Sequence, residues 1–249
     1  VLVINSVHTP ASNLAVLDAL QRDYSQIRIA LRPEGAQFAG AINYGFEIAS
    51  CDRVGLLLSD DQIAPETIER CLAHDADIVA TSRCGMDVGF AEKLWENKSD
   101  PARFAKFSTI EQRASYIGHF MLFNRAKVLS IGGVDPNIGL TGADDYDMIW
   151  TLLEAGASVE LIPEVMYFLR DHGGVRLTMR DQQSQIEDLR KILTKHGIVG
   201  EEAERMVEAK KKWYGTPGHV AKADPLWYLR GQNDNATSDD DQQQSRGHS

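Results

Sequence analysis

Short apolar runs alternate with helical patterns over the first 82 residues, and no other feature of the sequence limits the possible folds as much. Four runs have the length of a strand: VLVIN (1–5), QIRIAL (26–31), RVGLLL (53–58) and DADIVATS (75–82). Between them, apolar residues recur at helical spacing, as Leu14, Leu17 and Leu20 do. The continuous run at 53–58 is typical of a strand buried on both faces of a sheet. The alternation therefore predicts an α/β fold with a doubly wound sheet.

The rest of the chain has a different pattern. The segment from Arg83 to about Ser115 has weak periodicity and is expected to form a long insertion or lid. After it we expect a strand, a short helix, a turn-rich loop, an amphipathic helix and two short strands around Pro163, at 116–123, 124–131, 131–140, 144–156 and 157–172. Two charged helices are expected at 178–196 and 200–212, and the polar residues 231–249 are expected to be disordered.

Composition excludes several classes of function. The formal net charge of -10 argues against a general nucleic-acid binder, which needs Lys and Arg to neutralise phosphates. The three cysteines show no CxxC spacing, so neither a disulfide framework nor a zinc site is expected. No run of about 18 apolar residues and no leader is found, which predicts a soluble, cytoplasmic protein without a transmembrane segment.

Two groups of acidic residues are candidates for chemistry. Asp60 and Asp61 follow the apolar run 53–58, and ligands of open α/β sheets bind beyond the carboxyl ends of strands. The pair could hold Mg²⁺ or Mn²⁺ against nucleotide phosphates, or it could cap the next helix. The run DDYD (144–147) could contain a general base or form an ordinary acidic first turn. His172 could be a metal ligand or an exposed loop histidine.

The order of several motifs resembles a known family. The motifs are GAINYG (40–45), LLLSDDQIAP (56–65), IGGVD (131–135), GADDYDM (142–148) and LRDH (169–172). Together they resemble the inverting, nucleotide-sugar-dependent glycosyltransferases of GT-A fold, the family that contains the spore-coat glycosyltransferase. The family's usual first strand-helix unit has no counterpart before VLVIN.

The resemblance implies an architecture. It implies a Rossmann-like, mostly parallel mixed sheet flanked by helices, with further helices at the C-terminus. Residues 1–176 would form the catalytic domain, with a nucleotide-binding half at 1–82 and an acceptor half at 83–176. A helical extension at 177–230 and the tail at 231–249 would follow.

The resemblance also implies roles for single residues. Asp60, Asp61 and His172 would bind the metal, and Asp145 would be the catalytic base with Asp144 beside it. Leu58 stands where the family has the acid that contacts ribose, so Ser59 or Asp61 would take over that contact. Arg170 would face the leaving group. The remaining residues near the nucleotide would be Asn5, Ser6, Thr9, Arg32 and Asn43.

The implied function is transfer of a sugar from a UDP-sugar to an acceptor hydroxyl, with Mn²⁺ or Mg²⁺ as cofactor and inversion at the anomeric carbon. The acceptor would be a sugar, a lipid-linked molecule or a protein. The aromatic and basic segments 210–215 and 224–231 could meet a membrane-linked acceptor or a partner, although pinning of the C-terminal segment is favoured. The alternative is a catalytically inactive nucleotide-binding or partner-binding protein of the same fold. A nucleotidyltransferase is disfavoured because no GxGxR-like loop follows the first strand.

Overall fold

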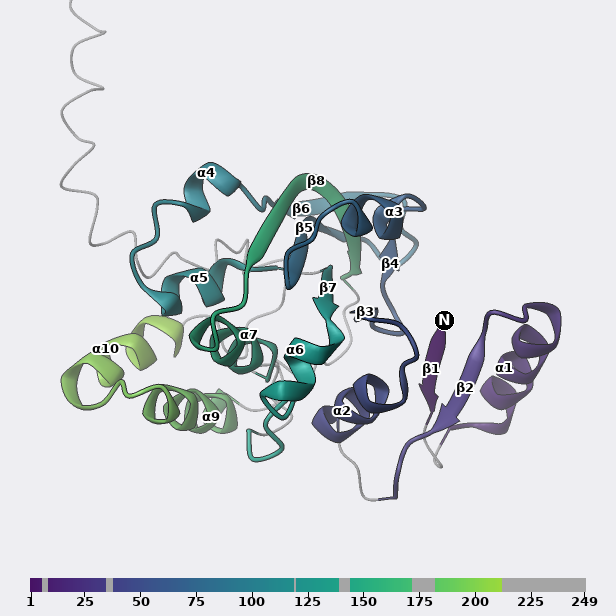
Figure 1. The fold of residues 1–249 in the computed structure, drawn as a ribbon, viewed down its shortest axis with the longest axis horizontal. Helices are drawn as coiled ribbons and strands as arrows, with labels where there is room; N and C mark the ends of the chain where they lie inside the picture. The colour runs from purple at the N-terminus through teal and green to yellow at the C-terminus, as the bar shows by residue number, and fades with distance from the viewer. Residues whose placement is uncertain (6–8, 35–37, 119, 139–143, 172–181, 212–249) are drawn as a thin grey trace, which may run out of the picture.

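The computed structural model describes residues 1–5, 9–34, 38–118, 120–138, 144–171 and 182–211. Within these residues the chain forms a small sheet and a larger sheet, with helices packed around them (Figure 1). The predicted Ser6, His172 and C-terminal tail lie outside the described residues.

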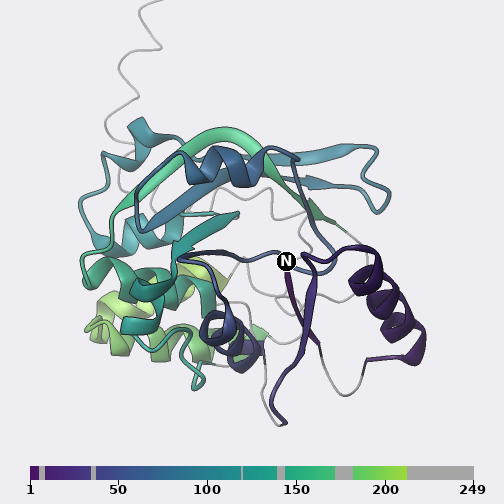
Figure 2. The same cartoon turned by 45° about the vertical axis from the view of Figure 1, so that its right-hand side comes forward.

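The small sheet contains the first two strands of the chain. Strands β1 (Leu2–Asn5) and β2 (Arg28–Leu31) are parallel, and helix α1 (Ala11–Asp23) connects them. Helix α1 buries none of its residues, and Leu14 and Leu20 remain 39% and 37% exposed. In Figures 1 and 2 this unit stands at one side of the molecule, with α2 (Phe38–Ile48) between it and the larger sheet.

The larger sheet has the strand order β3-β7-β5-β8-β4, with β6 paired to β5 off this path. Its strands are β3 (Arg53–Gly55), β4 (Gln62–Ile63), β5 (Ile78–Met86), β6 (Lys93–Asn97), β7 (Met121–Asn124) and β8 (Val159–Arg170). The predicted α/β class with a mixed sheet is confirmed. Of the described ladders in this sheet only β5 with β8 is parallel, so the expectation of a mostly parallel sheet was wrong here. The reason is that β4, β6 and β7 each run against the strands beside them.

A single strand replaces the two short strands predicted around Pro163. Strand β8 runs through the proline because β8 itself bulges there: Thr81 of β5 pairs with Ile162, and the next residue, Ser82, pairs with Val165. Proline has no N–H for a ladder, and the bulge takes Pro163 out of the pairing with β5. The Ser82 hydroxyl donates to the Pro163 carbonyl at 2.7 Å and so satisfies that oxygen across the bulge.

The predicted buried strand at 53–58 ends early. Strand β3 stops at Gly55, and Leu57 and Leu58 are 50% and 37% exposed. A Cβ placed on Gly55 would lie only 2.1 Å from Cζ of Phe120, so the ring of Phe120 fills the space beside this glycine. Within the described sheet β3 pairs with β7 alone, and no second neighbour extends the strand beyond Gly55.

The segment 83–115 is an integral part of the fold, unlike the predicted insertion or lid. It contains the end of β5, strand β6 and helices α4 (Pro101–Phe104) and α5 (Ile110–Tyr116). Phe104, Phe107 and Tyr116 pack on one another, with ring centroids 5.1 to 6.4 Å apart. Phe107 is therefore part of a small core within this segment.

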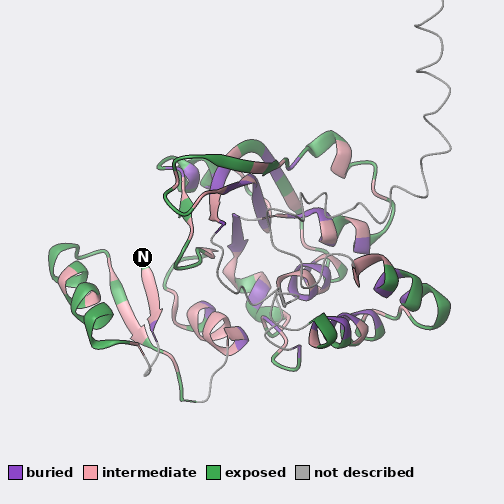
Figure 3. Ribbon diagram, turned by 180° about the vertical axis from the view of Figure 1, so that it is seen from behind, coloured by how far each residue is buried: buried purple, intermediate pink, exposed green. Residues whose placement is uncertain are grey.

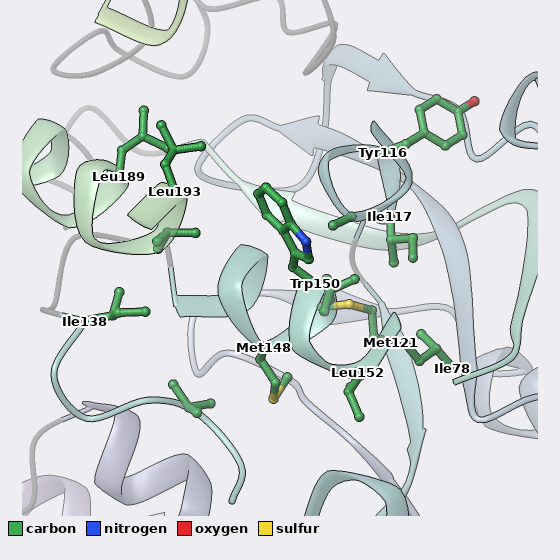
Figure 4. Close-up of a cluster of buried hydrophobic side chains, with 14 of the residues drawn as sticks. Ile78, Tyr116, Ile117, Met121, Ile138, Met148, Trp150, Leu152, Leu189 and Leu193 are labelled. Atoms are coloured by element: carbon green, nitrogen blue, oxygen red, sulfur yellow. The ribbon is translucent and has the colours of Figure 1, made fainter. Parts of the chain in front are cut away.

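The main core lies between the larger sheet and a layer of helices. Buried residues concentrate in the central strands and on the inner faces of these helices (Figure 3). Trp150 lies between the leucines at 189 and 193 and Ile117 (Figure 4). The predicted amphipathic helix is confirmed: Met148, Ile149 and Leu152 are 1% exposed. The helices not yet named are α3 (Thr67–Leu72), α6 (Arg125–Ser130), α7 (Asp144–Glu154), α9 (Gln182–Lys195) and α10 (Gly200–Lys211).

Candidate functional site

The two neighbouring acids Asp60 and Asp61 occupy the turn between β3 and β4, and they have different environments. The Asp61 carboxylate accepts a hydrogen bond from the Arg170 backbone N–H at 2.9 Å and a short one from the Tyr167 hydroxyl. Both donors belong to β8, so Asp61 fastens the turn to that strand. Burial, reinforced by the Asp61 carboxylate, raises the pKa of Tyr167 and keeps its hydroxyl protonated as a donor.

Asp60 is exposed at the same turn, as is Ser59. The Asp60 backbone carbonyl accepts a hydrogen bond from Nε of Arg170 at 3.0 Å. The Arg170 guanidinium also lies over the Phe90 ring, 4.6 Å from its centroid, so Phe90 supports an arginine. Arg170, which is predicted to face the leaving group, therefore lies beside Asp60, which is predicted to bind the metal.

The acids fit only one kind of metal site. Within the described ranges no group of three or more His, Cys, Asp and Glu side chains is placed to hold a metal ion by itself. A Mg²⁺ ion in a nucleotide site commonly takes one or two carboxylates and completes its shell with phosphates and water. Asp60, with Asp61 beside it, fits such an ion shared with a diphosphate and does not form an all-protein cage.

The acids of the DDYD run, at the start of α7, have different environments. Asp147 is 1% exposed and is paired with Nζ of Lys195 at 2.7 Å and with Nε2 of His196 at 3.1 Å. Burial opposes the charge of Lys195, but hydrogen bonds and charge from Asp147 and Asp135 outweigh it and raise the pKa of Lys195. Asp147 is therefore a structural acid that ties α7 to the end of α9.

Asp145 remains half-buried at the beginning of α7, and its Oδ1 accepts the Tyr146 backbone N–H at 2.8 Å. Asp144 begins the helix, and its side chain is outside the described part of the structure. Of the described acids in the run, Asp145 is thus the one that Lys195 and His196 do not bind.

Arg83 connects the two acidic positions, and sequence analysis missed it. Its Nε atom is buried and has no hydrogen-bond partner among the described atoms. Burial lowers the pKa of Arg83, while the charges of Asp145 and Asp61 act in the opposite direction. The guanidinium is thus within electrostatic range of both Asp145 and Asp61. The strand predicted at 75–82 ended four residues too early, since β5 continues to Met86, and this left Arg83 in the supposed lid.

Lys210 is a second missed residue near Asp145. It belongs to α10, and its Nζ lies 3.9 Å from the centroid of the Tyr146 ring. Burial lowers the pKa of Lys210 to about 8, and the charges of Glu111 and Asp145 oppose this shift. The pattern of α10 predicts a charged surface helix, and nothing in it indicates a half-buried lysine against Tyr146.

Asn43 has a structural contact that joins two of the sequence motifs. Its Nδ2 donates to the Val134 carbonyl and its Oδ1 accepts the Val134 N–H, both at 2.8 Å. A Cβ on Gly133, which has φ +75°, would lie 2.2 Å from Oδ1 of Asn43. The pair holds the IGGVD loop against α2. The predicted contact between Asn43 and a nucleotide stays a prediction.

The other predicted nucleotide residues gather at the end of the small sheet. Asn5 ends β1, and its Oδ1 accepts a hydrogen bond from the Thr9 hydroxyl at 2.5 Å. Arg32 follows β2, and its backbone N–H donates to the Asn5 carbonyl at 2.9 Å. Asn5, Thr9 and Arg32 therefore lie together at the carboxyl edge of two parallel strands, where α/β folds bind ligands.

Comparison with protein families identifies the chain. Residues 1–132 match the sequence profile of glycosyl transferase family 2, which is more than half of the 249 residues. The chain belongs to glycosyl transferase family 2. The predicted membership of a glycosyltransferase family is thereby confirmed. The match includes Asp60 and Asp61 and ends before Asp145.

Relatives of this family 2 chain are found among known proteins. It is 27% identical over 176 residues to the O-antigen biosynthesis protein RfbC of Myxococcus xanthus, which covers 68% of the chain. The chain spans 13% of the length of that relative.

Solved structures confirm the predicted GT-A fold. TarS from S. aureus, in complex with UDP-GlcNAc, gives a TM-score of 0.59 at 16% identity and covers 85% of this chain and 62% of its own. The mannosyltransferase PcManGT of Pyrobaculum calidifontis, in complex with GDP-Man and Mn²⁺, gives 0.56 at 16% identity, covering 93% and 69%. Among the described helices, none has the length and apolar character needed to cross a bilayer.

Proposed function

We propose that this family 2 chain transfers a sugar from a nucleoside diphosphate sugar to an acceptor hydroxyl, with the help of a divalent cation. The observation that carries the proposal is the arrangement of the acids: Asp60 lies at a turn that Asp61 fastens to β8, and Asp145 lies at the start of α7, with the Arg83 guanidinium of β5 in electrostatic range of Asp61 and Asp145. Two structures of the same fold, bound to UDP-GlcNAc and to GDP-Man with Mn²⁺, support this class of donor. We take UDP as the first nucleotide to test.

The chemistry needs positive charge at the donor side. Transfer breaks the bond between the anomeric carbon and a diphosphate oxygen, and negative charge grows on the leaving group. A bound Mg²⁺ or Mn²⁺ ion would stabilise that charge as a Lewis acid. In this chain Asp60, supported by Asp61, would hold the ion. Arg170, whose Nε is hydrogen-bonded at the Asp60 carbonyl, would add positive charge beside the diphosphate.

Asp145 would serve the acceptor. In an inverting transfer the acceptor hydroxyl attacks the anomeric carbon from the side opposite the diphosphate. A carboxylate on that side accepts the hydroxyl proton as the new bond forms. Asp145 is the described acid of the DDYD run that Lys195 and His196 do not engage, whereas Asp147 is bound to both.

Calorimetric titration with UDP and GDP, with and without Mn²⁺, tests the donor site. We expect manganese-dependent binding of UDP by the wild type and its loss in Asp60→Ala. Glu69→Ala removes an exposed acid from α3 and should bind like the wild type. Failure of the wild type to bind either nucleotide under both conditions would contradict the proposal.

A nucleotide-binding protein without transfer activity is the second candidate, favoured by Leu58 in the place of an acid. Release of free UDP from UDP-GlcNAc and other UDP-sugars, measured with sugar and lipid-linked acceptors, separates the two. Transfer by the wild type and at least a hundredfold slower transfer by Asp145→Asn would support the enzyme, in line with the rate gain of about 10²–10⁴ from a positioned base. Binding of UDP without turnover of any donor would support the second candidate.

A further inference from the structure

The last described helix delivers a lysine to the turn that carries the proposed base. Lys210 lies in the final turn of α10, outside the part of the chain that matches the family profile. Its Nζ lies 3.9 Å from the centroid of the Tyr146 ring, a distance at which a cation is attracted by an aromatic face. Tyr146 directly follows Asp145, and its backbone N–H donates to the Asp145 carboxylate.

A buried acid completes the arrangement. Glu111 of α5 is 7% exposed, and its Oε1 accepts hydrogen bonds from the hydroxyls of Tyr146 and Ser115, both at 2.9 Å. A buried carboxylate is costly unless it is hydrogen-bonded and near a positive charge. Lys210 supplies that charge, so Glu111 and Lys210 stabilise each other around the Tyr146 side chain.

The described charges around this cluster come from several elements. Glu111 of α5 and Asp145 of α7 are the acids among the described residues whose charges raise the pKa of Lys210, and Arg83 of β5 is a further described cation within electrostatic range of Asp145. Helix α9 also packs on α10, but there Arg190 pairs with Glu204, and Gln182 donates to the Lys211 carbonyl. The ammonium of Lys210 therefore acts mainly on Glu111 and Asp145.

We propose that Lys210 is a positioning residue of the transfer reaction, which makes α10 part of the catalytic site. Its ammonium holds the Tyr146 ring and the Glu111 carboxylate in place and adds positive charge beside Asp145. This inference rests on the proposed function, in which Asp145 is the general base.

The pH dependence of kcat tests the role in catalysis. Lys210→Met keeps the apolar stem but removes the charge beside the proposed base, so kcat should fall and its acid limb should move to higher pH by about one unit. The KM for the donor should stay unchanged. Lys210→Arg should keep the wild-type acid limb and should lose any alkaline fall near pH 8, because the guanidinium stays protonated there. Lys211→Met is the matched control, since Lys211 pairs with Glu208 at the surface.

A second measurement needs no activity. In protein labelled with ¹³C at lysine Cε, one resonance should titrate near pH 8 and be missing in Lys210→Arg. In Asp145→Asn the same resonance should titrate at lower pH, because a neighbouring negative charge has been removed. The wild type and the four variants should be checked for equal thermal unfolding.

The outcomes separate this inference from the proposed function. Wild-type kcat and an unchanged acid limb in Lys210→Met would overturn the role of Lys210, and so would a lysine titration that Asp145→Asn does not move. Transfer by Asp145→Asn at the wild-type rate would instead remove the proposed base. A shifted lysine titration in that variant would still place the ammonium beside Asp145.

Discussion

Gly133 lies so close to the Asn43 side chain that a larger residue would not fit there. Its φ is +75°, and a Cβ would overlap Oδ1 of Asn43 at 2.2 Å. Gly132 has a similar φ of +84°, but a Cβ there would have no heavy atom within 4 Å. The two neighbours thus separate the effect of backbone conformation from that of the contact with Asn43.

We predict that Gly132→Ala costs about 1 kcal/mol of unfolding free energy, from the left-handed conformation alone. Gly133→Ala should cost about 3 kcal/mol, because the methyl group also breaks the paired hydrogen bonds between Asn43 and Val134. Urea unfolding of both variants measures the difference. Equal costs would show that the Asn43 contact contributes nothing.

The three cysteines should differ in reactivity. Cys51 is exposed, whereas Cys71 and Cys84 are buried. Burial, partly offset by Arg70, raises the pKa of Cys71 to about 11, so it is a protonated and unreactive thiol at neutral pH. We predict that one thiol per chain reacts quickly with an aromatic disulfide reagent at pH 8 and that all three react in urea. Fast reaction of Cys51→Ala would contradict this.

The raised pKa of Cys71 also predicts an effect on stability. The folded state holds the Cys71 proton more tightly than the unfolded state, whose thiol has a pKa of 9.0. The stabilising contribution is therefore complete below pH 9 and is lost as the pH rises toward 11. We expect the unfolding free energy of the wild type to fall more steeply over this range than that of Cys71→Ala, measured by urea titration at each pH.

Single residues of the site were predictable where a local pattern marks them. Asp60 and Asp61 follow an apolar run, and Asp145 lies in an acidic first turn, so their positions could be read from the sequence. Their partners could not, because Tyr167 and Lys210 are distant in the chain and each sits in a segment with an ordinary pattern. The different roles of Asp60 and Asp61 depend on those partners.

At the scale of elements, α9 is fixed to α7 by a buried ionic cluster and to α10 by a surface pair. Asp147 is 1% exposed and binds both Lys195 and His196, whereas Arg190 and Glu204 pair at 2.8 Å with both side chains about half exposed. Breaking a buried pair leaves a charge without its partner, but an exposed pair contributes little.

We predict that Asp147→Ala lowers the unfolding free energy by about 3–5 kcal/mol and that Glu204→Ala lowers it by less than about 1 kcal/mol. Urea unfolding followed by far-ultraviolet circular dichroism gives both values. A loss below about 1 kcal/mol for Asp147→Ala would mean that the cluster does not hold α7 to α9.

Elements were predicted well where a periodic apolar face dominates. Helix α7 and helix α10 agree closely with their predicted ranges. Strand β8 was divided wrongly because Pro163 lies in a bulge of β8, and β5 pairs with β8 on both sides of that bulge. The residues 157–172 alone do not show that the same partner strand continues past the proline.

On the scale of the whole molecule, the two sheets differ in how much support they have. Strand β5 pairs with three strands and contributes buried residues to both core clusters. Strands β1 and β2 pair only with each other among the described strands, and α1 buries none of its residues. A two-stranded sheet has little stability of its own.

We therefore predict that amide hydrogens in residues 1–31 exchange at least a hundredfold faster than those in β5 and β8, because local opening costs less there. Hydrogen exchange followed by mass spectrometry of peptides measures this. Added UDP and Mn²⁺ should slow exchange at 1–31 if Asn5 and Thr9 contact the nucleotide. Equal protection of both sheets without nucleotide would contradict the prediction.

The parallel pairing of β5 with β8 has a consequence for synthesis of the chain. Ile78 pairs with Val159, and the turn at Asp61 is fastened only when Tyr167 and Arg170 are present. Chains emerge from the ribosome N-terminal end first, and domains fold as units. The edge of β5 that pairs with β8 therefore stays unpaired until β8 has been synthesised. Lys210 is synthesised later still. A chain released early would keep the acids of the site while lacking the strand and helix that hold them in place.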